Sequence, residues 1–336
     1  MLLHPDGGVG IGLGHASRCI ALASALLRMG HQVSVLVEPE SGLADYLCRF
    51  QVPVIEGLSN SIQLQARSDE LRVDVIVIDS YRWLEADFMA VRRRGCRVVT
   101  FDDEARRRLP VDAVINGALA GPHLAYRTLP HTRLWLGLPY QVIREEFCEM
   151  QIRPLAGTVR RLIVLVGGDD PLGLMPQLAP RLNTIAGGMQ PPLQVEMICG
   201  PYSLLPFTDE LSHVKVTRHP LNLHERMQDA DLALSASGQT LYELACCGTP
   251  TIAFCSSGDQ AHNLAALAEA GVVWDTGQAN KPNWLDAVEE AIRTLAADFD
   301  RRQEMSKVAQ RLIDGRGADR LVDELQQLVA STVSQQ

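Results

Sequence analysis

A histidine stands at the end of a glycine-rich segment near the start of the chain, in the run Gly10-Ile11-Gly12-Leu13-Gly14-His15. Residues 1–3 can form a short strand, and the apolar spacing of residues 16–29 predicts a helix that ends at Gly30. A glycine turn between a strand and a helix directs free backbone N–H groups and the positive end of the helix at an anion. Histidine titrates near neutral pH, so His15 could act there as a general base. The alternative is a dinucleotide-type turn in which the histidine is incidental.

A second segment, residues 235–250, has the residue types of a diphosphate site. An apolar strand leads into small residues, and a helix is expected to begin at Gln239 or Thr240. Glu243 lies about one helical turn further along, where its carboxylate could accept hydrogen bonds from both hydroxyls of a ribose. The structural alternative is a capping serine followed by a solvated first-turn acid. The residues that could offer donors to the diphosphate are Ser237, Gly238, Gln239 and Thr240.

Short β-branched runs alternate with helical patterns along the whole chain, which predicts a doubly wound α/β architecture. The series restarts at residues 160–166, which end in another glycine turn, Gly167-Gly168-Asp169-Asp170-Pro171. We therefore expect two Rossmann-like domains, residues 1–152 and 153–336, facing each other across a cleft, with the linker near residues 150–157. A final helix is expected to pack on a domain edge. The predicted strands are residues 32–37, 73–78, 97–101, 113–115, 161–166, 193–198, 214–217, 232–235, 251–254 and 272–274.

The bulk properties of the chain narrow the class of protein. Its 336 residues are too many for one ordinary core, and a net charge of −9 without a basic stripe argues against nucleic acid as a partner. The eight cysteines show no Cys-x-x-Cys spacing, as expected of small core residues in a reducing compartment. Neither a secretory signal nor a bilayer-spanning apolar run is evident. A cytoplasmic protein without a transmembrane segment is expected.

Several short motifs together resemble one family over roughly residues 5–275. The family comprises the hydrolases that release UDP from UDP-2,4-diacetamido-2,4,6-trideoxy-β-L-altropyranose in pseudaminic acid biosynthesis, a bacterial surface-sugar pathway. Its wider superfamily includes the peptidoglycan N-acetylglucosaminyltransferase of the GT-B fold, which residues 235–250 also resemble. The resemblance implies a GT-B-like fold. The motifs are Gly12-x-Gly14-His15-x-x-Arg18-Cys19, Asp79-Ser80-Tyr81, Phe101-Asp102-Asp103, Val114-Ile115-Asn116, Leu136-Gly137-Leu138-Pro139-Tyr140 and Arg144-Glu145-Glu146-Phe147.

The resemblance implies roles for individual residues. His15 would activate the attacking water, and Tyr81 would contact the reacting water or sugar, although it could instead only cover the wall of the site. Where the family commonly carries Asp-Asn-Gln, this chain has Gly258-Asp259-Gln260. Asp259 could orient a sugar hydroxyl, support His15 as a second acid, or indicate a different acceptor or sugar. From the residues themselves, the loop at Asp102 and Asp103 is expected to shape the sugar pocket or to cap the next element. The expected nucleotide- and substrate-binding residues are Gly12, Gly14, Arg18, Gly168, Ser237, Gly238, Gln239, Thr240, Glu243 and Gln260.

The reaction expected from these residues is cleavage of an anomeric C–O bond, with UDP as the leaving group and inversion at the anomeric carbon. No metal is expected, because no DxD-type setting joins the acidic pair Asp102-Asp103 to the nucleotide half. No separate cofactor is expected, because the UDP belongs to the substrate. A GT-B glycosyltransferase that uses a hydroxyl acceptor in place of water is the nearest alternative, since His15 could serve either reaction. A non-catalytic nucleotide-sugar binding protein is an alternative of another class.

Overall fold

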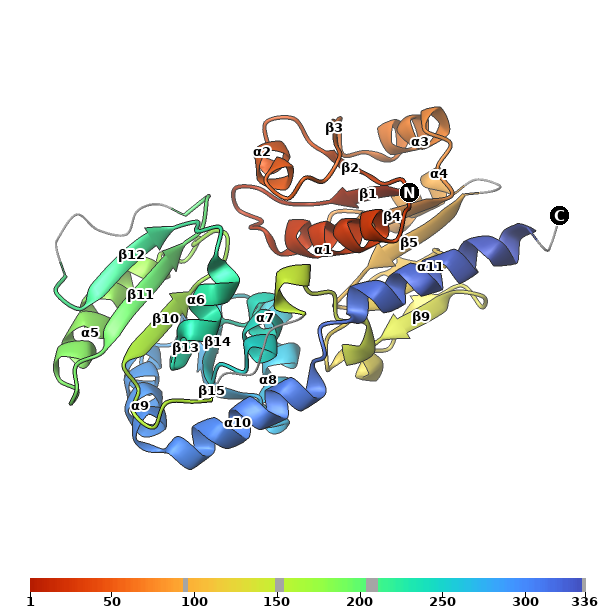
Figure 1. The fold of residues 1–336 in the computed structure, drawn as a ribbon. Helices are drawn as coiled ribbons and strands as arrows, with labels where there is room; N and C mark the ends of the chain where they lie inside the picture. Colours follow the sequence, from red (N-terminus) through yellow and green to blue (C-terminus); the bar gives the residue numbers. More distant parts are fainter. Residues whose placement is uncertain (93–95, 149–153, 204–210, 334–336) are drawn as a thin grey trace. The chain divides into compact units, whose positions relative to one another are not determined.

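The structure is a computed structural model that describes residues 1–92, 96–148, 154–203 and 211–333 (Figure 1). The contacts between residues divide the chain into two compact units. Unit 1 consists of Met1–Glu145 together with the chain from Gly315 onward, and unit 2 consists of Glu146–Asp314. Each unit has its own parallel sheet and its own core, as predicted for two α/β domains.

Unit 1 contains a seven-stranded parallel sheet in its described residues, and β1 lies next to the central strand β4, between β2 and β4. The strand order is β3-β2-β1-β4-β5-β7-β9, and β6 and β8 form a separate short pair. The strands are β1 (Leu2–Pro5), β2 (Ser34–Val37), β3 (Val54–Glu56), β4 (Val75–Asp79), β5 (Arg97–Phe101), β6 (Arg108–Leu109), β7 (Ala113–Asn116), β8 (Arg127–Thr128) and β9 (Arg133–Leu136). The helices are α1 (Gly14–Arg28), α2 (Leu43–Cys48), α3 (Ser61–Glu70), α4 (Glu85–Val91), α11 (Gly317–Val333) and the 3-10 turns η1 (Gly121–His123), η2 (Leu138–Tyr140) and η3 (Glu145–Phe147), the last of which crosses into unit 2.

Helices cover both faces of the unit 1 sheet, which is why its central strands are apolar without interruption. Successive strand residues point to opposite faces of a sheet. On one face Leu3, Val77 and Val99 share a core with residues of α1 and α11. On the other face Leu2 and Ile76 share a core with residues of α3 and α4. Burial on both faces is what parallel sheets require.

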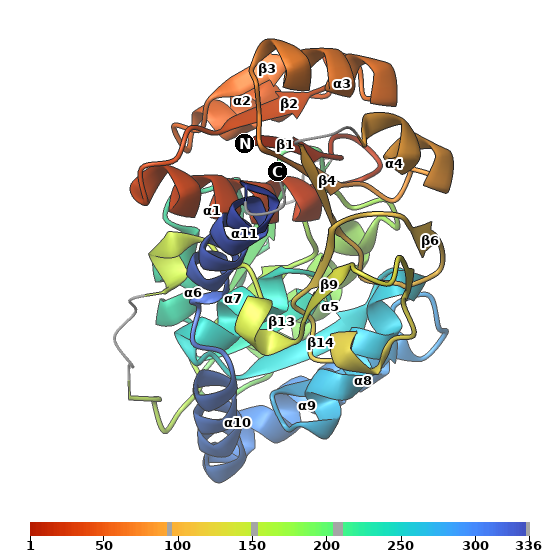
Figure 2. The same ribbon diagram turned by 90° about the vertical axis from the view of Figure 1, so that its right-hand side faces the viewer.

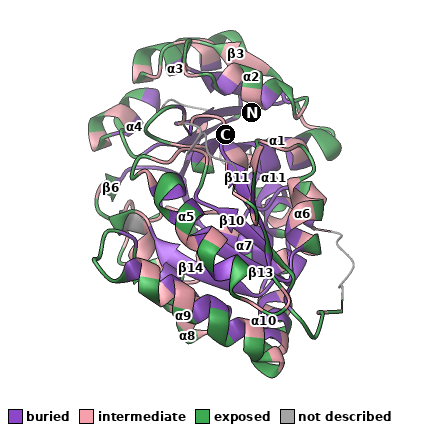
Figure 3. Ribbon diagram, turned by 90° about the vertical axis from the view of Figure 1, so that its left-hand side faces the viewer, coloured by how far each residue is buried: buried purple, intermediate pink, exposed green. Residues whose placement is uncertain are grey.

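Unit 2 repeats this plan with a six-stranded parallel sheet in its described residues, in the order β12-β11-β10-β13-β14-β15. Its central strands are buried (Figure 3). The strands are β10 (Arg161–Leu165), β11 (Gln194–Cys199), β12 (Val214–Arg218), β13 (Leu232–Ala236), β14 (Thr251–Cys255) and β15 (Val273–Gln278). The helices are α5 (Leu174–Gly187), α6 (Leu223–Asp229), α7 (Thr240–Cys247), η4 (Gly258–Gln260), α8 (Ala261–Glu269), α9 (Trp284–Ala297) and α10 (Phe299–Leu312).

All eleven predicted strands, including the short one at residues 1–3, are present within a few residues of their expected bounds. Four further strands were not predicted, namely β3, β6, β8 and β9. The strands β3 and β9 form the two edges of the unit 1 sheet and are largely half-buried, so they lack a continuous apolar run. The strands β6 and β8 have only two residues each, too few to show a period.

The predicted domain boundary is wrong at the end of the chain. Residues 315–336 were assigned to the second domain, but α11 packs against α1 of unit 1 (Figures 1 and 2). Leu321 and Leu325 join the core that α1 shares with the sheet, and Arg28 of α1 forms an ion pair with Asp319. The apolar stripe of a helix shows that it is buried but not against which sheet. The predicted boundary between residues 152 and 153 lies outside the described residues, and the crossing falls at Glu145/Glu146.

The start of α11 is held by a close backbone approach at Gly317. A Cβ atom at this position would lie 2.1 Å from the carbonyl oxygen of Gln141. We expect Gly317→Ala to lower the free energy of unfolding by about 1–3 kcal/mol, because overpacking forces the backbone to shift. Urea denaturation measures this change. Gly157→Ala is the control, because a Cβ at Gly157 has no neighbour within 4 Å, and equal midpoints for the two variants would contradict the close approach.

Five of the eight cysteines, Cys19, Cys96, Cys199, Cys247 and Cys255, are buried, as predicted for small core residues. Cys148 and Cys246 are half-buried, Cys48 is exposed, and none of the eight forms a disulfide. Over the described ranges of the chain, the helices are all too short or too polar to cross a bilayer.

Candidate active site

The glycine-rich loop after β1 places His15 in the first turn of α1. The N–H of Gly8 donates to the carbonyl of Gly12 at 3.2 Å, and the N–H of Gly12 donates to the carbonyl of Gly8 at 2.9 Å. Both residues have positive φ angles, 115° and 84°, which glycine adopts without strain. The Gly12 N–H is therefore used within the loop. The Gly14 N–H has no acceptor among the described residues, and the space beside its Cα is open, so Gly14 remains available to a ligand.

His15 contacts a buried carboxylate through one ring nitrogen. Its Nδ1 atom lies 2.5 Å from Oδ1 of Asp79, the last residue of β4, which pairs with β1. Asp79 is fully buried, and His15 is 8% exposed. An ionised carboxylate only accepts hydrogen bonds, so the proton of the neutral ring lies on Nδ1 and Nε2 carries the lone pair. Nη2 of Arg18 also lies 3.3 Å from Nδ1, but a protonated Nδ1 cannot accept from it, so the shorter contact is the hydrogen bond.

Arg18, one turn along α1, joins two carboxylates. Its Nε donates to Oδ2 of Asp79 at 2.5 Å and its Nη2 donates to Oδ1 at 2.7 Å, while its Nη1 donates to Oδ2 of Asp103 at 2.6 Å. The guanidinium carbon also lies 4.7 Å from the centre of the Phe101 ring. Burial would raise the pKa of Asp79, but the charges and hydrogen bonds of Arg18 and His15 hold that pKa well below its ordinary value. All three nitrogens of Arg18 thus contact carboxylates, whereas the sequence predicted a nucleotide ligand.

Tyr81 lies beside the imidazole and is fixed by the same acid that Arg18 contacts. Its hydroxyl donates to Oδ2 of Asp103 at 2.9 Å. Its ring packs edge-on against His15, with the ring centres 4.8 Å apart and the planes at 79°. Burial and the charge of Asp103 raise the pKa of Tyr81 far above its ordinary value, so the phenol keeps its proton. Tyr81 can therefore shield His15 and accept a hydrogen bond, but it cannot serve as a base.

These five residues, His15, Arg18, Asp79, Tyr81 and Asp103, form one connected group that we call the His15 cluster. The sequence assigned site roles to His15, Arg18 and Tyr81. It gave Asp103 only the shaping of the sugar pocket or a capping role, and it gave Asp79 no role. Both acids stand at the carboxyl ends of buried parallel strands, where ligands bind in open α/β sheets, and this position was the available signal. Asp102 has the capping role, because its Oδ1 accepts the N–H groups of Glu104 and Ala105.

In unit 2, the turn between β13 and α7 presents unused donors. The backbone N–H groups of Gly238 and Thr240 have no acceptor among the described residues. The hydroxyl of Ser237 donates to the carbonyl of Phe254 at 2.7 Å, so its proton is not available to a phosphate. Gln239 is the N-cap residue of α7, without a side-chain cap. Ser237 is therefore not the N-cap that the structural alternative required.

Glu243 differs from a solvated first-turn acid, because it is only 3% exposed. Gln260 lies near the same turn, where its Nε2 atom is 3.9 Å from the Cβ position of Gly238. Its Oε1 accepts from both the N–H and the hydroxyl of Ser256. The structure thus brings the predicted residues of β13, α7 and η4 together at one end of the unit 2 sheet. The backbone of Asp259 lies in η4, but its side chain is outside the described part of the chain.

Gly168 lies in the loop that follows β10, at the carboxyl end of a neighbouring strand. Its carbonyl accepts the N–H of Tyr202 at 3.2 Å. A Cβ at Gly200 would lie 2.4 Å from that carbonyl oxygen, so the loops after β10 and β11 are in close contact. Gly168 therefore lies at the same end of the sheet, at the carboxyl ends of its strands, as the turn before α7.

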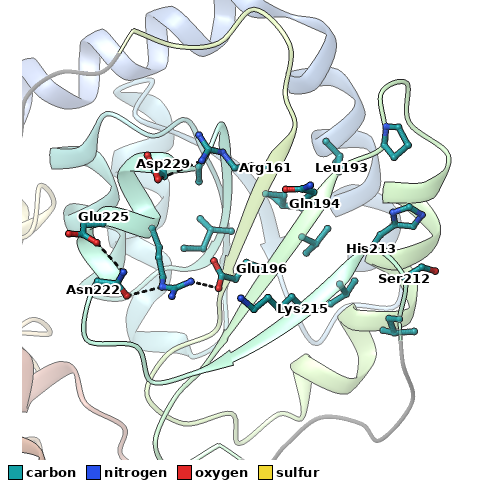
Figure 4. A pocket seen from close by; sticks show the side chains of 18 residues that line it. Arg161, Leu193, Gln194, Glu196, Ser212, His213, Lys215, Asn222, Glu225 and Asp229 are labelled. Carbon is teal, nitrogen blue, oxygen red and sulfur yellow. Dashed lines mark hydrogen bonds and ion pairs between the residues drawn. The ribbon is translucent and has the colours of Figure 1, made fainter.

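A separate pocket of unit 2 lies over β10, β11, β12 and α6 (Figure 4). Ion pairs cross it between Arg226 and Glu196 and, at 3.6 Å, between Arg161 and Asp229. None of the predicted site residues lines this pocket. Over the described ranges, no three His, Cys, Asp or Glu side chains are grouped so that they could hold a metal ion.

One protein family and several solved structures are similar to this chain. The family model for the glycosyltransferase family 28 C-terminal domain matches residues 162–321, which run from within β10 into α11 and include every predicted nucleotide residue of unit 2. Two solved structures are similar over nearly the whole of both chains. The spinosyn forosaminyltransferase SpnP has a TM-score of 0.68 at 16% identity over 98% of each chain. MurG of Acinetobacter baumannii has a TM-score of 0.64 at 16% identity over 97% of this chain and 99% of its own. The fold is therefore GT-B-like.

Three curated relatives share between 21% and 24% sequence identity with this chain. An uncharacterized protein of Methanocaldococcus jannaschii is 24% identical over 74% of this chain and 54% of its own length. A Helicobacter pylori protein is 21% identical over 87% of this chain and 48% of its own, and its name joins a pseudaminic acid cytidylyltransferase with a UDP-2,4-diacetamido-2,4,6-trideoxy-beta-L-altropyranose hydrolase. The chain spans about half the length of these two. The spore coat polysaccharide biosynthesis protein SpsG of Bacillus subtilis is 21% identical over 96% of both chains.

Proposed function

We propose that this protein is an enzyme that transfers a glycosyl unit from a nucleoside diphosphate sugar, in first place a UDP-sugar, to a hydroxyl acceptor. The observation that carries the proposal is the hydrogen bond between Nδ1 of His15 and the buried Asp79, because it leaves Nε2 as a base. The match of residues 162–321 to a glycosyltransferase domain and the glycosyltransferase structures of the same fold favour transfer over hydrolysis. The sequence alone had placed hydrolysis first.

The proposed reaction is a single displacement at the anomeric carbon. Nε2 of His15 takes the proton of the acceptor hydroxyl. At the same time the hydroxyl oxygen of the acceptor forms the new bond to the anomeric carbon. The bond to the diphosphate breaks, and its electron pair leaves with the nucleotide. Asp79 stabilises the imidazolium that forms, and the free N–H groups of Gly238 and Thr240 face the charge that develops on the diphosphate. A single displacement inverts the anomeric carbon.

Hydrolysis of a UDP-sugar is the second candidate, with water in place of the acceptor. The Helicobacter pylori relative supports it, because part of its name is that of a UDP-sugar hydrolase and the alignment covers 87% of this chain. Pseudaminic acid biosynthesis is then the pathway the resemblance suggests. The chemistry at His15 is the same in both candidates, so the nucleophile alone distinguishes them.

A donor panel distinguishes the candidates. Purified protein is mixed with UDP- and dTDP-sugars, including the diacetamido-trideoxy-altrose donor, with and without sugar and alkyl alcohol acceptors, and release of the diphosphate is followed. Release that requires an acceptor supports the transferase, and release in water alone supports the hydrolase. Binding of UDP without release under any condition would overturn both and indicate a nucleotide-sugar binding protein.

The buried carboxylate of Glu243 is proposed to accept the ribose hydroxyls. We expect Glu243→Gln to raise the Kd for UDP by about tenfold to a hundredfold, because hydrogen bonds to a charged group contribute about 1.5–3 kcal/mol. Isothermal titration calorimetry measures the change, with Glu269→Gln on the exposed face of α8 as the control. A 2′,3′-dideoxy UDP should bind both forms equally. An unchanged Kd for UDP would remove Glu243 from the site.

A further inference from the structure

The side chain of Arg18 connects the two halves of the His15 cluster. Two of its nitrogens bind Asp79, which orients His15, and the third binds Asp103, which holds the hydroxyl of Tyr81. The chain of contacts therefore runs from the imidazole through two carboxylates and one guanidinium to the phenol. The phenol ring of Tyr81 also packs directly against the imidazole, with the ring centres 4.8 Å apart, so the contacts form a closed loop.

The geometry of this connection needs an arginine. A guanidinium is planar and presents its donors in a fixed fork, so it can bind both oxygens of Asp79 while a third nitrogen reaches Asp103. A lysine ammonium is a point charge without that fork. Removal of the fork would leave Asp79 free to rotate about its side-chain bonds, and His15 would lose its fixed partner.

The same contacts argue against Arg18 as a ligand of the diphosphate. Its side chain is 13% exposed, and each of its nitrogens already contacts a carboxylate oxygen. Its single positive charge stands between the negative charges of Asp79 and Asp103. A group in this setting adds no net positive charge with which to attract a phosphate.

We infer that Arg18 is a positioning residue, which couples the orientation of the base His15 to the orientation of Tyr81. Arg18 holds Asp79 so that Nδ1 of His15 stays protonated, and it holds Asp103 so that the Tyr81 ring stays against the imidazole. The predicted effect on turnover rests on the proposed function. The expected UDP affinity rests on it too, because UDP is proposed to bind to unit 2, whereas the effect on the tautomer of His15 does not.

The test compares Arg18→Lys with the wild type. NMR spectra are recorded on protein labelled with ¹⁵N-histidine, and the signal of His15 is the one that is missing from the spectrum of His15→Ala. In the wild type this signal should show one tautomer, with the proton on Nδ1. Arg18→Lys should show a mixture of the two tautomers. Its kcat should fall by about tenfold to a hundredfold, as expected when a catalytic group is misplaced, with little change in KM. The Kd for UDP should stay the same, because UDP is proposed to bind to unit 2.

Arg28→Lys is the matched control, because Arg28 lies on the same helix and also contacts two acids, Glu145 and Asp319. It should keep the tautomer and the turnover of the wild type. An unchanged tautomer in Arg18→Lys would overturn the inference, and so would a rise in the Kd for UDP with kcat unchanged, which marks a nucleotide ligand. If no substrate is turned over, the proposed function fails, and the tautomer still decides whether Arg18 positions His15.

Discussion

Replacement of His15 by alanine is expected to lower kcat by about a hundredfold to ten-thousandfold, the usual contribution of a general base. The reason is the loss of Nε2, the nitrogen that Asp79 leaves unprotonated. The Kd for UDP should not change, because the proposed contacts to UDP lie in unit 2. Steady-state kinetics together with titration calorimetry measure both quantities and separate a loss of catalysis from a loss of binding.

The control for this experiment is His131→Ala, a change at an exposed histidine of the same unit. It should keep both kcat and the Kd for UDP. Full turnover in His15→Ala would contradict the catalytic role of His15. A large rise in the Kd for UDP would instead place His15 among the nucleotide ligands, as the glycine-turn pattern also allows.

The second large effect is expected for Asp79→Asn, which keeps the size of the side chain and removes its charge. The amide can no longer stabilise the imidazolium that forms when His15 takes a proton, so kcat should fall by about a hundredfold to ten-thousandfold. Arg18 keeps Asp103 as a partner, so the fold should survive with reduced stability. The Kd for UDP should again stay the same. Asp45→Asn, at an exposed acid of α2, is the control, and a kcat equal to that of the wild type would remove Asp79 from the mechanism.

The same variant changes how stability depends on pH. The folded-state pKa of Asp79 is lowered by Arg18 and His15 against the opposing effect of burial. A lowered pKa means that the ionised carboxylate stabilises the fold at every pH above its unfolded value of about 4, and that this contribution is lost as the pH falls toward the folded value. Asp79→Asn lacks that contribution. Its urea midpoint should therefore decline less than that of the wild type between about pH 5 and pH 2.

The fold was predictable because its signals are local. The uninterrupted apolar run of residues 75–78 shows burial on both faces, which only a helix-covered parallel sheet provides. The edge strand β9 was missed because only Trp135 of its four residues is buried. The helix α11 was assigned to the wrong unit because its amphipathic pattern carries no information about its partner, and that partner, α1, lies about 300 residues earlier in the chain.

The site was predictable in part for the same reason. His15 follows a glycine turn, and residues 237–240 precede a helix, so both patterns lie within one short segment. Arg18 was expected among the nucleotide- and substrate-binding residues because its motif resembles that of the hydrolase family. Its actual partners, Asp79 and Asp103, lie 61 and 85 residues away and are brought to it by the order of the strands. Contacts that depend on strand order cannot be derived from the spacing around one motif.

The most direct test of a base-assisted displacement by His15 is to follow the wild-type reaction by ¹H and ³¹P NMR with the donor and acceptor panel. The account predicts that the diphosphate signal grows and that the first product has the opposite anomeric configuration to the donor, whichever oxygen nucleophile is used. A first product with retained configuration would contradict the single displacement. Tight binding of UDP without any release of the diphosphate from a donor would contradict the claim that the protein is an enzyme.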